Sequence, residues 1–452
     1  MNKRTILTLA ALAGVAIGLR AQTPEEGFFL RDNKLSFQYN PAMVPEGGFL
    51  SVGKLESATL NNVGMGAFLY PVGDRLVTGL NEAVPAGTFL GNLLDDNRML
   101  GDLKFNLFSW GVRKGDAFHT AEVSIRGNYG ASVPKEIFTF MKLGSGEGSY
   151  DMADFRLQGQ IMVEAAYGYT RRISDILSVG ARAKLLLGMY GGSYSVTRFN
   201  LSTTDGAYTA QCEAQLELTS RKGMFLPNEN GYIDFSKLSY KDMWKLPSAG
   251  GLAVDLGVVL TPAEGLTLSA SVLDLGALVW YYGNAGYSEG VAKFEGLGEM
   301  TQSDLNAAEV VRRLLGMGDQ LIQPFRPMVA QKKVRVNRVP LRAHLGAKYE
   351  MPFYRALSIG ATGSYIAYPG LAWWDARLGV EVNPVKWFDI MADAGMGAFG
   401  PVWGMAASVK MGPFCLTTSL QDGFGKKVPY TRSPLKANNR TVTIGLTYDL
   451  GK

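Results

Sequence analysis

The chain has 452 residues, of which 55 are glycine, 11% are aromatic and only 19% are charged. Soluble domains usually contain about 7% glycine and about a quarter charged residues. The formal net charge of +5 comes from lysines and arginines scattered singly, which argues against a nucleic-acid-binding protein. The two cysteines and two histidines have no metal-binding spacing, so the sequence predicts no metal and no other cofactor.

The first 21 residues have the order of a secretory signal peptide. Residues 1–4 are basic, residues 5–19 are apolar, and Ala21 is a small residue followed by a polar stretch. The apolar run is shorter than the span of about 20 residues that a transmembrane helix needs. We therefore expect residues 1–21 to direct the chain across the inner membrane and to be removed.

Beyond the signal segment, apolar residues recur at every second position, the period of a strand with one apolar face. Val442, Ile444 and Leu446, for example, alternate with Thr443 and Gly445. Comparable runs lie near residues 63–71, 101–114, 117–131, 154–173, 176–200, 206–220, 251–260, 265–282, 335–350, 357–365, 377–383, 385–399, 402–411 and 413–421. No uninterrupted apolar run is long enough for a spanning helix, and closed barrels are the other way to cross a bilayer. The sequence predicts an all-β fold, a transmembrane antiparallel up-and-down β-barrel of about 14 strands, with a soluble β-sandwich or propeller as the alternative.

Turns and longer connections distinguish the two ends of the predicted barrel. Turn residues at 72–74, 114–116, 173–175, 262–265 and 411–413 are expected at the periplasmic end, where barrels keep their turns short. Residues 221–248 are predicted as a long loop. Residues 134–143 open with proline and residues 301–317 have apolar residues at helical spacing, so both are predicted as short helices that cap or plug the barrel.

The segment before the first predicted strand is expected to enter the barrel. This divides the chain into a signal peptide (1–21), a plug segment (22–62) and the barrel (63–452). The plug is centred on Asn40-Pro41-Ala42. Proline fixes its own φ and disfavours helix at the preceding residue, which predicts an irregular, rigid insert. We expect Asn40 to satisfy backbone groups inside the lumen, while Phe37 and Tyr39 either line a ligand pocket or pack against the wall.

Charged residues of both signs lie on the polar face of the alternation. At mid-depth, an arginine or lysine facing lipid costs about 2–4 kcal/mol, so these residues are expected to face the lumen. They are Arg126, Glu164, Arg182, Lys184, Asp255, Arg342, Lys348, Arg377, Glu381, Asp393 and Lys410. Because the signs are mixed, mutual pairing is favoured over an ion-lined pore, which remains the alternative.

The reactive side chains do not form a recognisable catalytic set. His344 lies between two cations without a carboxylate to orient it, and His119 follows a turn at a strand end. No Gly-x-Ser-x-Gly motif supplies a nucleophile, so we predict that the protein is not an enzyme. Cys212 is expected on the lipid face and Cys415 on the lumen face, which predicts that they form no disulfide.

Several blocks of the sequence resemble known barrel families. Residues 35–42, which end in Asn40-Pro41-Ala42, resemble the opening of FadL-like barrels and their PorV-type relatives. Residues 108–113 with 132–138, 164–169 with 177–184, and 255–257 with 269–276 and Trp280 are similar to an uncharacterised Bacteroidota barrel family, domain of unknown function 5723. The resemblance covers most of the mature chain and implies an outer-membrane barrel of FadL-like build with an N-terminal plug.

Three classes of function remain open. The first is a FadL-like passage for hydrophobic or amphipathic small molecules. The second is a PorV-like accessory barrel that anchors partner proteins at the cell surface, and the third is a purely structural barrel. The expected partners are outer-membrane lipid and the barrel-assembly machinery, together with a hydrophobic small-molecule ligand in the first class and surface proteins in the second.

Overall fold

A computed structural model describes residues 28–451 except 32, 74, 144–147, 152, 205–206, 220–246, 295–327, 369–370, 399 and 422–437. The predicted signal segment, the predicted helix at 301–317 and nearly all of the predicted loop at 221–248 lie outside the described residues. No helix in the described part of the chain has the length and apolar character to cross a bilayer.

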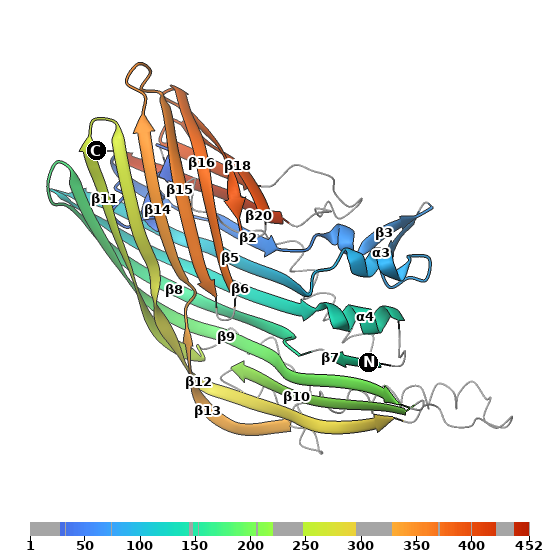
Figure 1. The fold of residues 1–452 in the computed structure, drawn as a ribbon. Coiled ribbons are helices and arrows are strands. Elements are labelled where there is room, and N and C mark those ends of the chain that lie inside the picture. The colour runs from blue at the N-terminus through green and yellow to red at the C-terminus, as the bar shows by residue number, and fades with distance from the viewer. Residues whose placement is uncertain are drawn as a thin grey trace.

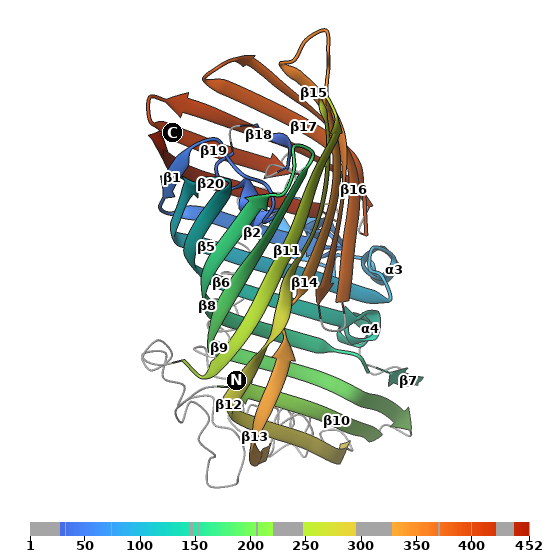
Figure 2. The same cartoon turned by 90° about the vertical axis from the view of Figure 1, so that its left-hand side faces the viewer.

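All described strands except β3 and β4 form one antiparallel sheet of 18 strands that closes on itself, because the last strand pairs with the first two (Figures 1 and 2). The strands are β1 (Gly48–Ser51), β2 (Lys54–Asn61), β5 (Asp96–Lys114), β6 (Ala117–Pro134), β7 (Gly148–Asp151), β8 (Arg156–Arg172), β9 (Leu177–Thr204), β10 (Ala207–Thr219), β11 (Ala249–Ala263), β12 (Leu266–Phe294), β13 (Met328–Arg338), β14 (Leu341–Glu350), β15 (Leu357–Tyr368), β16 (Leu371–Val385), β17 (Phe388–Gly397), β18 (Gly400–Met411), β19 (Phe414–Gln421) and β20 (Asn438–Gly451).

Some of these strands continue one another along the wall. β1 and β2 both pair with β5 and β20, and β10 and β11 both pair with β9 and β12. β13 and β14 both pair with β12, and the short β7 only flanks β9. The wall is therefore a closed antiparallel barrel of 14 strands, which confirms the predicted fold class and strand number.

Polar side chains face the inside of the barrel and apolar side chains face the outside. On β16, Arg377 and Glu381 are buried, whereas Leu378 between them is 71% exposed. On β20, Thr443 is buried and its neighbour Ile444 is 52% exposed. This pattern places apolar side chains where lipid would lie and polar side chains in the lumen.

The two ends of the barrel differ in their connections. The hairpin turns β5–β6, β11–β12 and β18–β19 lie at one end, the turn end, where β20 also stops (Figure 1). Gly115 and Gly265 occupy two of these turns with φ of 60° and 81°, a conformation that glycine adopts without strain. The opposite end, the loop end, carries the helices α3 (Ala86–Gly91) and α4 (Lys135–Leu143) and the hairpin of β3 (Leu69–Val72) and β4 (Arg75–Thr78).

Residues 62–95 and α4 form a small unit, the loop-end module, with its own apolar core. Val84, Phe89 and Leu93 are buried in it, and the ring of Phe138 on α4 lies 5.5 Å from that of Phe68. The module includes the 3-10 helix η2 (Met65–Ala67). α4 confirms the helix predicted at residues 134–143, whereas the pattern analysis did not predict α3.

The predicted boundary between plug and barrel was wrong. Residues 48–61 were assigned to the plug, but they form the first line of the wall as β1 and β2, and the predicted first strand at 63–71 lies in the loop-end module instead. The period of two is obscured in β2 because Ala58 and Leu60 face inward and pack against Ile366 and Trp373 across the lumen. With apolar residues on the inner face, the usual contrast between faces disappears.

Cys415 is a free, buried cysteine whose Sγ lies 3.0 Å from the hydroxyl oxygen of Ser408. The predicted absence of a disulfide is therefore confirmed. The side chain of Cys212 lies outside the described residues, so its predicted lipid-facing position stays a prediction.

Candidate functional site

Residues 28–45, which we call the plug, lie inside the barrel at the turn end. Two aromatic rings of the plug pack against glycines of the wall. A Cβ at Gly346 would lie 2.7 Å from the ring of Phe28, and a Cβ at Gly379 would lie 2.7 Å from the ring of Phe29. Both rings are buried. The rings can therefore pack this closely because glycine has no side chain.

The N-terminal part of the plug is also held by charged groups. The backbone N–H of Arg31 donates to Glu381 at 2.9 Å and to Asp389 at 2.8 Å. The ammonium of Lys348 donates to the carbonyl of Phe29 at 2.6 Å and forms an ion pair with Glu381. Two wall carboxylates and one wall lysine therefore fix the backbone of this short segment.

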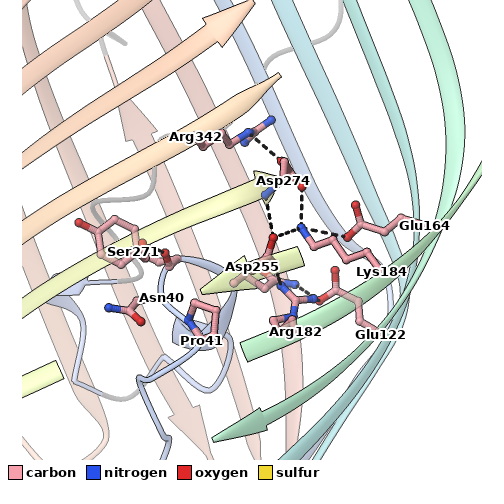
Figure 3. A network of polar contacts seen from close by, with 12 residues as sticks. Asn40, Pro41, Glu122, Glu164, Arg182, Lys184, Asp255, Ser271, Asp274 and Arg342 are labelled. Carbon is pink, nitrogen blue, oxygen red and sulfur yellow. Dashed lines mark hydrogen bonds and ion pairs between the residues drawn. The ribbon is translucent and has the colours of Figure 1, made fainter. Parts of the chain in front are cut away.

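Asn40, which lies beside Pro41 in Figure 3, is fully buried, and its side-chain amide has four hydrogen-bond partners. Its Nδ2 donates to the Val258 carbonyl at 3.0 Å, to the Ser269 hydroxyl at 2.7 Å and to the Ala270 carbonyl at 3.1 Å. Its Oδ1 accepts from the backbone N–H of Ala42 at 2.8 Å. One side of the amide thus shapes the plug turn, and the other side attaches that turn to β11 and β12.

Two paired glycines form the socket for this turn. Gly180 on β9 and Gly257 on β11 lie opposite each other in the ladder. A Cβ at Gly257 would come within 1.9 Å of the Asn40 Oδ1, and a Cβ at Gly180 within 2.2 Å of the Pro41 carbonyl oxygen. That oxygen also accepts a hydrogen bond from the Thr170 hydroxyl at 2.5 Å. Only glycine allows the plug backbone to approach the wall so closely.

A network of buried ion pairs fills the lumen next to the plug (Figure 3). It contains equal numbers of cations and anions. The cations are Lys54, Lys104, Arg126, Arg182, Lys184 and Arg342, and the anions are Glu56, Asp102, Glu122, Glu164, Asp255 and Asp274. Buried charges are tolerated when they are paired and hydrogen-bonded, so this balance allows the network to exist inside the wall.

The network joins strands that are not neighbours in the wall. Arg342 on β14 forms an ion pair at 2.6 Å with Asp102 on β5, and Arg126 on β6 forms one at 2.9 Å with Asp274 on β12. It also reaches the plug, because Gln38 donates to Glu122 at 2.7 Å. The plug and the network are therefore in contact inside the barrel, and the network links strands from different parts of the wall.

A β-bulge brings Asp274 into this network. The register of β11 against β12 shifts between Val254 and Leu256, and Asp274 has a φ of 62°. Its N–H donates to the Asp255 carboxylate at 2.8 Å, while its own carboxylate lies 2.6 Å from the ammonium of Lys184. Bulges re-aim a side chain in this way, and they are frequent beside functional sites.

On the loop-end side of Asp274 lies a cavity of about 810 Å³. Six polar residues of its lining come from β6, β8, β9 and β13 and face inward. These residues are Asn128, Gln158, Gln160, Ser193, Arg335 and Asn337. The lining also includes Leu275, Ala277 and Val336, which belong to the outward face of the wall. The cavity therefore reaches both faces of the barrel wall.

The strand ladder is interrupted beside this cavity. β12 pairs with β14 as far as Leu273 and with β13 from Ala277 onward. Between these points, the described backbone contact is the N–H of Val339 donating to the Gly276 carbonyl at 3.2 Å. Pro340 follows, and proline has no N–H to offer. On the loop-end side of this break, β13 pairs only with β12 among the described strands, so the ladder is incomplete where the cavity meets the wall.

Residues 41–419 match a family of unknown function (DUF5723). The chain belongs to this family. The match includes the plug turn from Pro41 onward, all residues of the buried network and all residues that line the cavity. No curated protein sequence matches the chain.

Solved structures of similar barrels share little sequence with this family member. The toluene transporter TbuX of Ralstonia pickettii is 10% identical with a TM-score of 0.43, covering 96% of this chain and 95% of that one. The toluene transporter TodX of Pseudomonas putida is 8% identical with a TM-score of 0.43, covering 95% and 97%. A FadL homologue of Pseudomonas aeruginosa is 12% identical with a TM-score of 0.42, covering 95% of each chain. At such values, nothing about the function of those proteins carries over to this chain.

The charged residues predicted from alternation fall into three buried groups and one separate position. The network contains Arg126, Glu164, Arg182, Lys184, Asp255 and Arg342. Lys348 and Glu381 hold the plug, and Arg377 contacts Asp375 at 2.6 Å and Asp393 at 2.8 Å. Lys410 lies apart from these groups, at a small recess on the turn end next to Lys34 and Asp449.

Pattern analysis missed several network members. Glu122 has the same alternation phase as Arg126 on β6, so the pattern contained a signal for it. Asp274 gave no such signal, because the bulge reverses the phase of β12: Ser271 faces inward before it, and Leu278 and Trp280 face inward after it. A single displaced residue is invisible to a period-of-two analysis.

Each histidine has one hydroxyl group as a side-chain partner. His344 is buried, stacks on the plug residue Tyr39 with ring centres 4.8 Å apart, and has its Nδ1 3.1 Å from the hydroxyl of Ser364. A nitrogen of His119 lies 2.7 Å from the hydroxyl of Tyr167 on the outer face. Among the described residues, no group of histidine, cysteine and carboxylate side chains is arranged to hold a metal ion.

Proposed function

We propose that this protein is an outer-membrane barrel that passes small amphipathic molecules from the cell surface through the wall rather than along the barrel axis. In the proposed orientation of the barrel in the membrane, the turn end lies in the periplasm and the loop end faces the outside of the cell, because barrels have short periplasmic turns. The molecule enters the cavity from the loop end. It then leaves sideways between β12 and the β13–β14 junction.

One observation carries this proposal: the cavity lies on the loop-end side of the plug and the network, where the pairing of β12 passes from β14 to β13. The plug and the network obstruct the axial route. The cavity lining includes both inward-facing Gln160 and outward-facing Leu275 and Val336. A solute that moved along the axis would have to separate buried ion pairs and leave charges without partners, which is costly. A route through the wall avoids that cost.

The test is uptake by intact cells of an amphipathic dye, N-phenyl-1-naphthylamine, which fluoresces once it reaches the membrane interior. Ala277→Trp adds an indole to the wall side of the cavity, whereas Ala361→Trp adds one to an exposed outward position away from it. We expect Ala277→Trp to reduce uptake to that of cells lacking the barrel, and Ala361→Trp to leave it unchanged. Equal uptake by both variants would contradict a sideways route.

A second function, anchoring of partner proteins at the cell surface, is favoured by the loop-end module. Met141 and Leu143 on α4 are each 55% exposed, although they belong to a unit with its own apolar core. Exposed apolar side chains on a folded projection are a feature of interaction sites. If anchoring is the function, Met141→Lys with Leu143→Lys abolishes surface retention of the partner and leaves dye uptake intact.

A further inference from the structure

The polar lining of the cavity indicates which molecules it binds. Four of its side chains form two cross-strand pairs on three adjacent strands: Asn128 lies opposite Gln160, and Gln158 lies opposite Ser193. Amide and hydroxyl groups both donate and accept hydrogen bonds. The amide nitrogen of Asn128 is buried and has no hydrogen-bond partner among the residues that the structure describes. A buried donor of this kind is costly unless a ligand or water satisfies it.

Asp274 and Arg335, the charged residues on the inward-facing side of the cavity, are already paired, whereas Arg338 lines it from the exposed outward face. Asp274 is shared by Arg126 at 2.9 Å and Lys184 at 2.6 Å. Arg335 forms an ion pair with Glu217, and its guanidinium also lies 3.5 Å from the hydroxyl of Ser193. An ionic ligand could bind Asp274 or Arg335 only by breaking the ion pairs that these residues already form. The inward-facing side of the cavity therefore provides hydrogen-bonding groups, and its charged residues already have partners.

We infer that the cavity recognises uncharged molecules that carry several hydroxyl or amide groups on one side and an apolar group on the other. This inference rests on the proposed function and specifies its substrate class. The hydroxyl-rich part faces Asn128, Gln160 and Ser193, and the apolar part points to Leu275 and Val336 at the break in the wall. A volume of about 810 Å³ lies within the roughly 300–1,000 Å³ of pockets that hold drug-sized ligands.

Equilibrium dialysis with the purified, detergent-solubilised full-length barrel tests this inference separately from transport. The probes are 4-nitrophenyl β-glucoside, which is uncharged and hydroxyl-rich, 4-nitrobenzoate, which is anionic, and 4-nitrotoluene, which lacks polar hydrogens. We expect the glucoside to bind most tightly. Gln160→Leu and Asn128→Leu should each weaken its binding by about tenfold, because each removes hydrogen bonds to a buried polar group, and neither should weaken binding of 4-nitrotoluene.

Gln211→Leu is the matched control, because Gln211 is a half-buried amide on β10 that does not line the cavity. Far-ultraviolet circular dichroism establishes that each variant keeps its β-structure. Tighter binding of 4-nitrobenzoate that is lost in Arg335→Gln would overturn the inference in favour of anions. Tightest binding of 4-nitrotoluene, no binding of any probe, or equal effects of Gln160→Leu and Gln211→Leu would overturn it as well. Normal dye uptake alongside any of these results would leave the sideways passage standing.

Discussion

The two halves of the lumen follow opposite principles of construction. In the turn-end half, Gly180 and Gly257 admit the plug backbone, and the Asn40 amide satisfies three wall acceptors. In the loop-end half, a ladder is broken, a large cavity remains and the Asn128 amide donor has no partner. The contrast suggests that the turn-end half serves closure, whereas the loop-end half serves binding.

The strongest way to break the closed half is to unbalance its ion-pair network. Lys184→Met leaves Asp255 and Asp274 without the ammonium that lies 2.8 and 2.6 Å from them. Loss of one partner of a buried pair costs about 3–5 kcal/mol, and we expect that loss in the free energy of unfolding measured by urea titration in detergent micelles. Lys184→Met combined with Asp255→Asn restores neutrality and should regain much of it. A double variant no more stable than the single one would argue against the importance of charge balance.

A smaller effect is expected from filling the glycine socket. Gly257→Ala places a Cβ only 1.9 Å from the side-chain oxygen of Asn40, so the plug turn must move. Overpacking of this kind costs about 1–3 kcal/mol, which here weakens plug docking rather than the barrel. The measurement is the rate of trypsin cleavage after Lys34, which is 7% exposed in the seated plug. Gly127→Ala is the control because its Cβ would meet no atom closer than 3.8 Å. Equal cleavage rates in both variants would show that the glycine socket does not hold the plug.

Alternation in the sequence predicted the wall because both faces obey the same local rule. Arg126 and Arg182 were placed inside because their neighbours in the chain are apolar or small, and no distant contact was needed for that inference. The rule failed where local geometry changes: at Asp274, where a bulge reverses the phase, and in β2, where Ala58 and Leu60 point inward. Those exceptions lie where the lumen is closed by contacts across the barrel.

The socket was beyond any local pattern. Asn40 and Pro41 marked the plug turn, but the wall groups that hold Asn40 lie 218 to 230 residues further along the chain. Gly257 resembled any other small residue of a glycine-rich strand, since a missing side chain gives no signal about what occupies its place. The cavity depends in the same way on the junction of β13 and β14, which the sequence pattern presented as one continuous strand.

The smallest of the expected effects concerns the Asn40 amide itself. Asn40→Ala removes the donor to Val258, Ser269 and Ala270, but it leaves the glycine socket open and the rest of the plug in place. Each hydrogen bond contributes about 0.5–1.5 kcal/mol net, and water entering the vacated site replaces part of that, so we expect plug docking to weaken by about 2 kcal/mol. Hydrogen exchange should show faster exchange at residues 36–43 and no change in the barrel strands. Asn92→Ala, which removes an exposed amide contact with Tyr70 in the loop-end module, should leave exchange in the plug unchanged. If Asn40→Ala exchanges like the unaltered protein, the plug is held by its rings and ion pairs, and the amide has only a local role in shaping the turn.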